Sequence, residues 1–313
     1  MNGLWHRHAW IAYGAVLLGV FGHASSEFFS VLSGVAGPEV SVWRYLLGGA
    51  GLLLWTLATP QTRDLWTPLR RDGLRIVALS LGGVTVPYLA FHWSLDYASV
   101  VQVATLTTTI PIFVALTNLI ANRMPITVPK MLSGACAVAG VALLVTDGYV
   151  AQLAGSGREL KGIGLVLITA ATGSAYAVLV RPLIAEYGAL RLTAISMAIG
   201  GVGLWLLVGF AWDIWVNPLT LFDRPAIESY SLLTIGLWNT TITQVLWLGG
   251  LAAVPDITRG SYVFFLKPVI AALLALLILG QPITVIQIVA IVVICGSVVA
   301  EIGWPRWVAV RAR

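Results

Sequence analysis

Long apolar runs separated by short polar segments follow one another along the whole chain. Ten such runs lie at residues 10–31, 39–58, 73–93, 97–120, 129–147, 161–183, 191–212, 231–251, 257–279 and 282–301. A helix needs about 20 apolar residues to cross the hydrocarbon core of a bilayer. Strands of a membrane barrel are about ten residues long and alternate apolar with polar positions, which these runs do not. The pattern therefore predicts an all-α membrane protein with ten transmembrane helices.

Composition excludes an ordinary soluble protein. Of 313 residues, 58% are hydrophobic and 10% are charged, and the mean hydropathy is +0.91. Soluble domains carry about 25% charged residues, so this chain has too few charges to cover a surface in water. The first run has full spanning length and no small-residue cleavage site after it, which predicts a retained helix. Cys136 and Cys295 fall inside runs and form no paired motif, so we expect neither a disulfide nor a metal site.

The distribution of positive charge predicts the orientation. Ten helices place both termini on one side, and if that side is the cytoplasm, thirteen of the 18 Lys and Arg residues lie in inner segments and three in outer ones. Arg44 and Lys267 lie within helices. This bias is typical of cytoplasmic loops and explains the net charge of +5 without nucleic-acid binding. We expect a multi-pass protein of the inner (cytoplasmic) membrane with both termini in the cytoplasm.

An internal repeat divides the chain. The segment at 111–127, PIFVALTNLIANRMPIT, matches PVIAALLALLILGQPIT at 268–284, with an offset of 157 residues. Pro111 and Pro268 correspond, and each copy runs into another apolar helix. The spacing predicts two five-helix repeats, residues 1–150 and 151–313, and an odd number of helices inverts one repeat relative to the other. Inverted repeats around a central cavity are typical of secondary transporters.

The paired motif resembles the drug/metabolite transporter superfamily, in its ten-helix EamA-like branch. Members carry a P…GE-x-[IL]-T motif at each of these junctions, an arginine early in the second helix, here Arg44 in VWRYLLGGAGLLLW, and a patch in the first helix like VFGHASSEFF. Met124 and Gln281 stand where the family has glutamate, so acid-based coupling is not implied there. The many tryptophans and the first and third helices are most similar to aromatic amino acid exporters of the YddG type. The resemblance implies export of small metabolites, and a structural role for Arg44.

Ionisable groups inside a bilayer normally face a cavity, a partner or a pathway. His23, Ser26, Glu27 and Ser30 follow a spacing that places them on one face of the first helix. We expect this face to line the cavity, with Glu27 as a contact for a substrate ammonium group and His23 as a titrating group. The alternative is a buried polar network that ties the first helix to its neighbours.

Lys267 precedes Pro268 in the middle of the ninth run. A proline can kink a helix and frees a carbonyl one turn earlier, so the pair predicts a bent cavity wall that binds an anionic group. An ion pair with Glu27 and hydrogen bonds to the freed carbonyls are the alternatives. Tyr262, five residues earlier, is expected to line the same side only loosely.

Further candidates lie on other helices. Tyr88, His92 and Asp96 follow four-residue steps and predict a gate or a substrate contact on the outer side, with interface anchoring as the alternative. Polar and bulky side chains predicted to shape the same cavity are Thr105, Tyr176, Trp238 and Asn239. Arg44 is expected near the membrane edge, in a structural role, with snorkelling and substrate contact as alternatives.

Motifs of soluble enzymes are missing from the sequence, including a P-loop and a G-x-S-x-G turn. Without a P-loop we expect no ATP hydrolysis within this chain, so transport would be driven by a gradient of the substrate or of protons, or by a partner. We expect a small-molecule substrate such as an amino acid, the lipid bilayer as surroundings, and no cofactor, metal, nucleic acid or obligatory protein partner. The alternatives are a carrier for other organic anions or drugs, and a bilayer-embedded lipid-modifying enzyme with His23–Glu27 or His92–Asp96 as acid–base pair.

Overall fold

The computed structural model describes residues 8–35, 37–98, 103, 106–146, 157–279 and 284–311. Over these residues all regular elements are helices and no strand occurs, which confirms the predicted all-helical class for this part of the chain. By length and composition, six described helices could cross a membrane: Ala9–Ser26, Gly37–Ala58, Trp66–Ser94, Leu160–Tyr187, Ala189–Trp212 and Ile257–Leu274. Shorter apolar helices run at Ile110–Asn122, Val128–Leu144 and Val285–Ala300.

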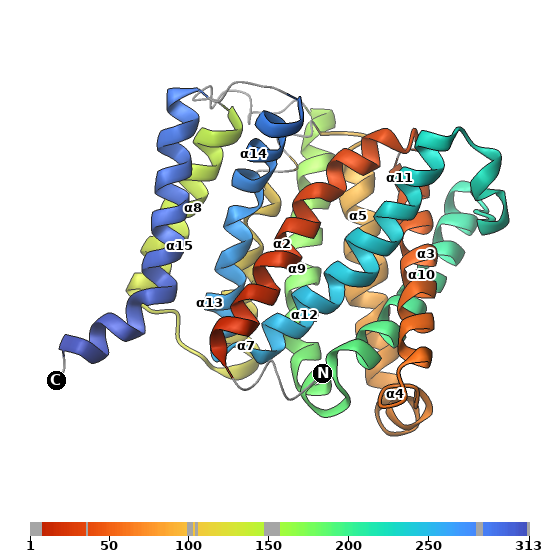
Figure 1. Cartoon of the computed structure of the whole chain (residues 1–313), viewed down its shortest axis with the longest axis horizontal. Coiled ribbons are helices and arrows are strands. Elements are labelled where there is room, and N and C mark those ends of the chain that lie inside the picture. The colour runs from red at the N-terminus through yellow and green to blue at the C-terminus, as the bar shows by residue number, and fades with distance from the viewer. Residues whose placement is uncertain are drawn as a thin grey trace.

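The helices of the first half of the chain pack beside one another as part of a helical bundle (Figure 1). They are α2 (Ala9–Leu32), α3 (Gly37–Ala58), the continuous segment α4 (Trp66–Ser80), η1 (Leu81–Thr85) and α5 (Val86–Ser94), then α7 (Ile110–Asn122) and α8 (Val128–Thr146). In η1 the helix widens to π geometry, a local change often found at functional sites.

The second half repeats this kind of arrangement. Its elements are α9 (Gly157–Tyr187), α10 (Ala189–Trp212), η3 (Pro218–Asp223), the continuous segment α11 (Ala226–Gly236), η4 (Leu237–Ile242) and α12 (Thr243–Ala253), then α13 (Ile257–Ser261), η5 (Tyr262–Leu266), α14 (Lys267–Leu279) and α15 (Val285–Arg311). The first residues of α2 and the last residues of α15 lie at the same, lower end of the molecule in Figure 1.

Helix boundaries follow the offset found in the sequence. The helices α14 and α15 begin 157 residues after α7 and α8, and the π-helix η4 ends 157 residues after η1. Pro111 and Pro268 each occupy the second position of their α-helix. A proline is tolerated in the first turn because its missing N–H would have no intrahelical acceptor there. Both prolines therefore begin a helix rather than interrupt one.

At the crossing of α3 and α10, glycines bring two backbones together. A Cβ added to Gly201 would lie 2.8 Å from the carbonyl oxygen of Tyr45, and one added to Gly49 would lie 3.2 Å from that of Met197. Small residues permit such close approach between helices in a membrane. The contact uses corresponding glycine pairs, so it is built in the same way from both halves.

The two π-helices pack against this crossing in corresponding ways. The hydroxyl of Thr85 in η1 donates to the carbonyl of Gly200 at 3.0 Å, and the hydroxyl of Thr241 in η4 donates to the carbonyl of Gly48, also at 3.0 Å. A Cβ on Gly200 or on Gly48 would collide with the η1 or η4 side chain next to it. Thus η1 of the first half packs on the glycines of α10, and η4 of the second half packs on the glycines of α3.

The helices α8 and α15 form one edge of the molecule (Figure 1) and pack on η5 through a separate apolar cluster that includes Phe265, Val141 and Ile294. Large apolar side chains cover much of the outer surface; for example Leu277 is 79% exposed and Phe210 is also 79% exposed. Exposed apolar residues all around a helical bundle are what lipid contact requires.

Candidate functional site

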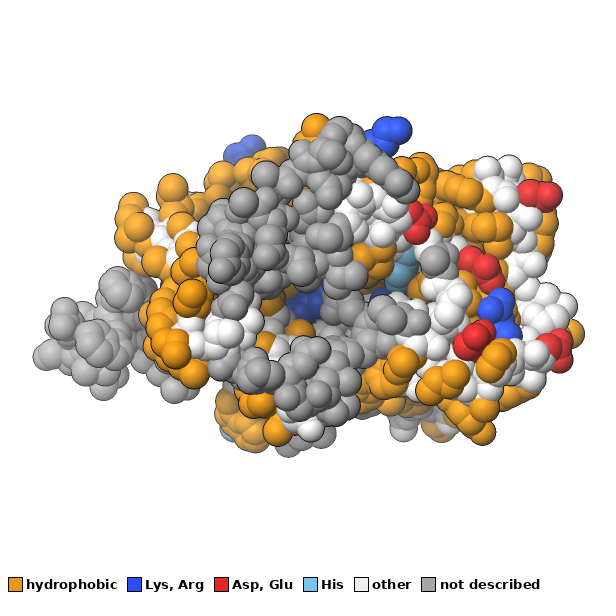
Figure 2. All heavy atoms as spheres, turned by 90° about the horizontal axis from the view of Figure 1, so that it is seen from above, with side chains coloured by type: hydrophobic (Ala, Val, Ile, Leu, Met, Phe, Trp, Pro, Cys, Tyr) orange, Lys and Arg blue, Asp and Glu red, His pale blue; other side chains and the backbone are white. Residues whose placement is uncertain are grey.

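A cavity lies between α2, α3, α5, α7, α9, α12 and the junction of η5 with α14. The cavity is narrow: about 80 Å³ of it is open to the centres of water molecules. Its lining residues are His23, Ser26, Arg44, Pro87, Tyr88, Phe91, Thr107, Ile110, Val114, Thr169, Gly173, Ser174, Ala177, Trp247, Phe264 and Lys267. Seen from above in Figure 2, a blue Lys or Arg side chain lies in a depression near the centre of the molecule. Both halves of the chain therefore contribute to one polar and aromatic chamber.

Lys267 is the first residue of α14 and only 5% exposed. The chain changes from the 3-10 helix η5 to an α-helix at this point, just before Pro268. The ammonium nitrogen lies 5.6 Å from the ring centre of Phe91 and 5.8 Å from that of Phe264. Aromatic faces attract a cation at such distances. They hold the ammonium group within the cavity wall, where it can meet an anionic group.

Arg44 reaches the same cavity from α3 and is 2% exposed, so it lies in the interior of the bundle. Its Nε donates to the hydroxyl of Thr240 at 3.0 Å and its Nη2 donates to the carbonyl of Asn239 at 3.1 Å. The guanidinium carbon is 5.7 Å from the ring centres of both Tyr45 and Tyr88. The arginine thus joins α3 to the π-helix of the other half while lining the chamber.

His23 lines the cavity from α2. Its ring meets those of Trp247 and Phe264 edge to face, with 5.8 Å between ring centres in each pair. Its Nε2 atom is buried and has no hydrogen-bond partner within the described part of the chain. Arg44 and Lys267 are both near enough to act on it electrostatically. Of the predicted stripe, Ser26 also lines the cavity, whereas the Glu27 side chain lies outside the described residues, as does its expected ion pair with Lys267.

Tyr88 lines the cavity from α5. Its hydroxyl accepts a hydrogen bond from Nε2 of Gln244 at 2.6 Å, and the same nitrogen lies 3.4 Å from the hydroxyl of Tyr45. The two tyrosine rings are 4.4 Å apart. Gln244 is 1% exposed and lies behind the tyrosines, so it fixes the side chain that the cavity presents.

Two predicted site residues instead connect helices near the cavity. His92 pairs through Nδ1 with the hydroxyl of Ser41 at 2.6 Å and is not among the lining residues, so it ties α5 to α3. Asn239 donates to the carbonyl of Gly22 at 2.6 Å and to the hydroxyl of Ser25 at 2.9 Å, so it ties η4 to α2. Neither side chain is among the lining residues.

Three further predicted residues also lie outside the lining. Trp238 donates from Nε1 to the hydroxyl of Ser25 at 3.2 Å. Tyr176 is buried against Gly83, where a Cβ would collide with its ring. Tyr262 donates from its hydroxyl to the carbonyl of Lys130 and belongs to the cluster beside α8 and α15. Thr105 lies outside the described residues.

The aromatic part of the wall is not predicted from the sequence. Phe91 and Phe264 flank the Lys267 ammonium group and Trp247 packs on His23, yet aromatic residues in an apolar run resemble ordinary core residues. A usable signal is spacing, because Phe264 precedes Lys267 by three residues and Phe91 follows Tyr88 by three. Among the described residues, no three His, Cys, Asp or Glu side chains are grouped so as to hold a metal ion.

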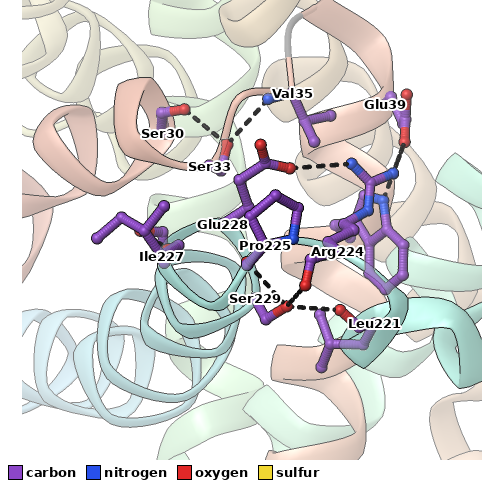
Figure 3. A network of polar contacts seen from close by, with 12 residues as sticks. Ser30, Ser33, Val35, Glu39, Leu221, Arg224, Pro225, Ile227, Glu228 and Ser229 are labelled. Carbon is purple, nitrogen blue, oxygen red and sulfur yellow. Dashed lines mark hydrogen bonds and ion pairs between the residues drawn. The ribbon is translucent and has the colours of Figure 1, made fainter.

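Charged contacts join the two halves at both ends of the bundle. At the end shown in Figure 3, Arg224 donates to Glu39 at 2.9 Å and lies 3.9 Å from Glu228. At the other end, Lys130 of α8 forms an ion pair with Asp256 at 2.6 Å, and Asp256 also accepts from the amides that begin α13.

The family model that matches this chain is that of the EamA-like transporter family, over residues 9–146 and 160–300. The chain belongs to the EamA-like transporter family. It is therefore a multi-pass membrane transporter of the drug/metabolite type, and the family resemblance inferred from the paired motif is confirmed at that level.

Relatives agree with this placement. A protein of Archaeoglobus fulgidus described as an uncharacterized transporter is 27% identical over 247 residues, or 78% of this chain and 80% of its own. One of Clostridium kluyveri with the same description is 29% identical over 167 residues, or 51% of this chain and 50% of its own. A crystal structure with 16% sequence identity matches 94% of this chain and 98% of its own with a TM-score of 0.76, which shows a shared fold.

Proposed function

We propose that this EamA-like transporter is a secondary carrier that exports small metabolites bearing a carboxylate, with amino acids, aromatic ones included, as its substrates. The observation that carries the proposal is the position of Lys267 in the cavity wall between the rings of Phe91 and Phe264. A lysine ammonium group offers three donors to a carboxylate. Apolar and aromatic walls around a few convergent polar groups are typical of small-molecule sites.

The same lining suits an aromatic side chain next to the carboxylate. Trp247 and Phe264 stand edge to face with His23, and Phe91 stands near Lys267. Such edge-to-face contacts favour a further ring over an aliphatic group. Serine and threonine hydroxyls of α9 on the opposite wall offer contacts for the polar end of a substrate, although Thr169 and Ser174 already donate to backbone carbonyls.

We propose alternating access between two inverted five-helix repeats, residues 1–150 and 151–313, with ten membrane-spanning helices in total. The offset of 157 residues between the boundaries of α7 and α14 supports two repeats, as do the corresponding contacts of Thr85 and Thr241. The positive-inside bias supports both termini in the cytoplasm of an inner-membrane protein. A proton gradient is the proposed coupling, with His23 as the candidate carrier because its Nε2 is buried in the cavity with no described partner.

A carrier for other organic anions is the second candidate. Arg44 and Lys267 bring two cations to the lining, and none of the described lining side chains is a carboxylate. An anion without an ammonium group would then satisfy this site as well as an amino acid does.

Uptake of labelled phenylalanine into proteoliposomes tests both candidates, with 3-phenylpropionate and 2-phenylethylamine as competitors. The first competitor keeps the carboxylate and loses the amine, and the second does the reverse. We expect phenylalanine to cross unaltered and 3-phenylpropionate to compete, whereas 2-phenylethylamine does not. Transport of 3-phenylpropionate without phenylalanine would replace the amino acid by the organic anion. Chemical conversion of the substrate, or no transport of either carboxylate, would contradict the proposal.

A further inference from the structure

The residues just before α4 and the first three turns of that helix carry four arginines within thirteen residues, Arg63, Arg70, Arg71 and Arg75. All four are exposed. Within the described residues none of them lies within 4.0 Å of a carboxylate oxygen, and Arg75 makes one long hydrogen bond, of 3.4 Å, to the carbonyl of Leu179. This segment lies at the same end of the molecule as the first residues of α2 and the last residues of α15 (Figure 1).

The two acidic residues of the segment have other partners. The Oδ1 atom of Asp64 accepts from the amides of Trp66 and Thr67, both at 3.1 Å. Hydrogen bonds from the hydroxyl and the amide of Thr67 hold the pKa of Asp64 below its usual range. Asp72 accepts from the hydroxyl of Tyr187. The carboxylates therefore begin the helix and fix it to α9, and the arginines keep their charge toward the outside.

Large apolar side chains stand among these arginines. Trp66 is 72% exposed and Leu74 is 87% exposed, whereas Leu65 and Leu69 pack on the core from the other side of the segment. The backbone leaves helical geometry at Asp72, with φ −124° and ψ 22°, so the first turns break from the spanning helix that follows. An apolar and basic outer face on such a segment is the pattern of a helix that lies in a membrane interface.

From this arrangement we infer that the segment Arg63–Arg75 is a docking surface for the anionic headgroups of phospholipids in the adjacent leaflet. Trp66 and Leu74 enter the boundary between headgroups and acyl chains, where an amphipathic tryptophan is favoured. The guanidinium groups bind headgroup phosphates, for which their planar donors are suited. Clusters of four or more basic residues next to a spanning helix attract anionic lipid in this way.

The docked segment is connected to the second half of the chain. Asp72 is held by Tyr187 at the end of α9, and the loop before the segment is held by Arg191 of α10, which donates to the carbonyls of Gln61 at 2.6 Å and Thr62 at 3.2 Å. Lipid bound at the arginines would therefore contact a segment that is hydrogen-bonded to helices of the second half of the chain.

Native mass spectrometry of the full chain in detergent tests the inference, with dioleoyl phosphatidylglycerol as the anionic probe and dioleoyl phosphatidylcholine as the neutral one. We expect the wild type to prefer the anionic lipid. The variant R70Q/R71Q should lose this preference by roughly fivefold per arginine removed. R70K/R71K should keep most of it, because the charge remains.

Arg123 provides a matched control, since it is exposed, directly follows the end of α7 and is outside the segment. R123Q should bind both lipids as the wild type does. Equal binding of the two lipids by the wild type, unchanged binding by R70Q/R71Q, or the same loss in R123Q would overturn the inference. Displacement of the lipid by inorganic phosphate at equal concentration would do so too, because it would show a free-anion site. If R70Q/R71Q does not fold, the preference of the wild type must still fall as salt is added.

Discussion

The guanidinium of Arg44 and the hydroxyl of Thr240 meet at 3.0 Å between α3 and the π-helix η4, in the interior of the bundle. The same guanidinium also donates a hydrogen bond to the carbonyl of Asn239. In a π-helix the regular ladder of backbone hydrogen bonds is shifted, and side chains fill the altered positions. The hydroxyls of Thr240 and Thr241 donate to the carbonyls of Ile235 and Gly236. Arg44 is thus a brace for a non-standard helix and part of the cavity wall.

We expect Arg44→Gln to reduce the free energy of unfolding by about 2 kcal/mol or more, because hydrogen bonds to a charged group each contribute about 1.5–3 kcal/mol. Thr240→Val should cost less, about 1.5 kcal/mol, since it removes only one of the two hydrogen bonds that Arg44 donates. Thermal unfolding in detergent measures both. The double variant should fall short of the sum of the two losses, because the partners are in contact. Additive losses would show that the two side chains stabilise the fold independently.

Two adjacent glycines in η1 should respond differently to alanine. A Cβ at Gly83 would collide with the Tyr176 side chain, whereas one at Gly82 meets nothing within 4 Å. We expect Gly83→Ala to destabilise the protein by roughly 1–3 kcal/mol, as overpacking does. Gly82→Ala should leave stability unchanged or raise it slightly. Similar melting temperatures for the two variants would contradict the close packing of η1 against α9.

Lys267 should affect transport more than folding. We expect Lys267→Met to lower phenylalanine uptake by roughly tenfold or more, the effect of removing a hydrogen bond to a charged group, while membrane insertion continues. Lys267→Arg should keep part of the activity because it keeps the charge. The matched control is Ile110→Met, since Ile110 is the first residue of α7, as Lys267 is of α14, and lines the same cavity without a charge. Full uptake by Lys267→Met would remove the carboxylate contact from the proposal.

Asp256 combines two roles that substitutions can separate. Its carboxylate pairs with Lys130 and also accepts from the amides of Thr258 and Arg259 at the start of α13. Asp256→Asn keeps an acceptor for the amides and loses the charge, which should cost roughly 1–2 kcal/mol of unfolding free energy. Asp256→Ala should cost about 1 kcal/mol more, because the helix cap is lost as well. The two variants would unfold alike if the cap carried no stability.

Hydropathy alone predicts the helical class and most helix positions, because run length and the burial of backbone polar groups decide both in a membrane. The offset of the paired prolines also predicts that α7 and α14 begin at corresponding residues. These features depend on local sequence. Which face of a helix lines the cavity depends on contacts with distant parts of the chain, and the sequence predicts these faces less completely.

Local helix geometry also affects which side chains share a face. Trp238 and Asn239 lie in the π-helix η4 and Tyr262 lies in the 3-10 helix η5, so spacings measured for a regular α-helix do not apply to them. His92 does follow Tyr88 on a regular helix, yet its ring is hydrogen-bonded to Ser41 of a neighbouring helix. A partner from a distant part of the chain cannot be read from the spacing of a single run.

The crossing of α3 and α10 is made by bare backbone at Gly49 and Gly201, with no side chain in between that could change its rotamer. Such a contact has no second arrangement of similar energy, since any sliding separates the two backbones or forces them together. It can serve as a fulcrum but not as a sliding surface. For the alternating access proposed above, we expect the chamber to open by a pivot around this point, with movement in elements whose neighbours are contacted through long, rotatable side chains.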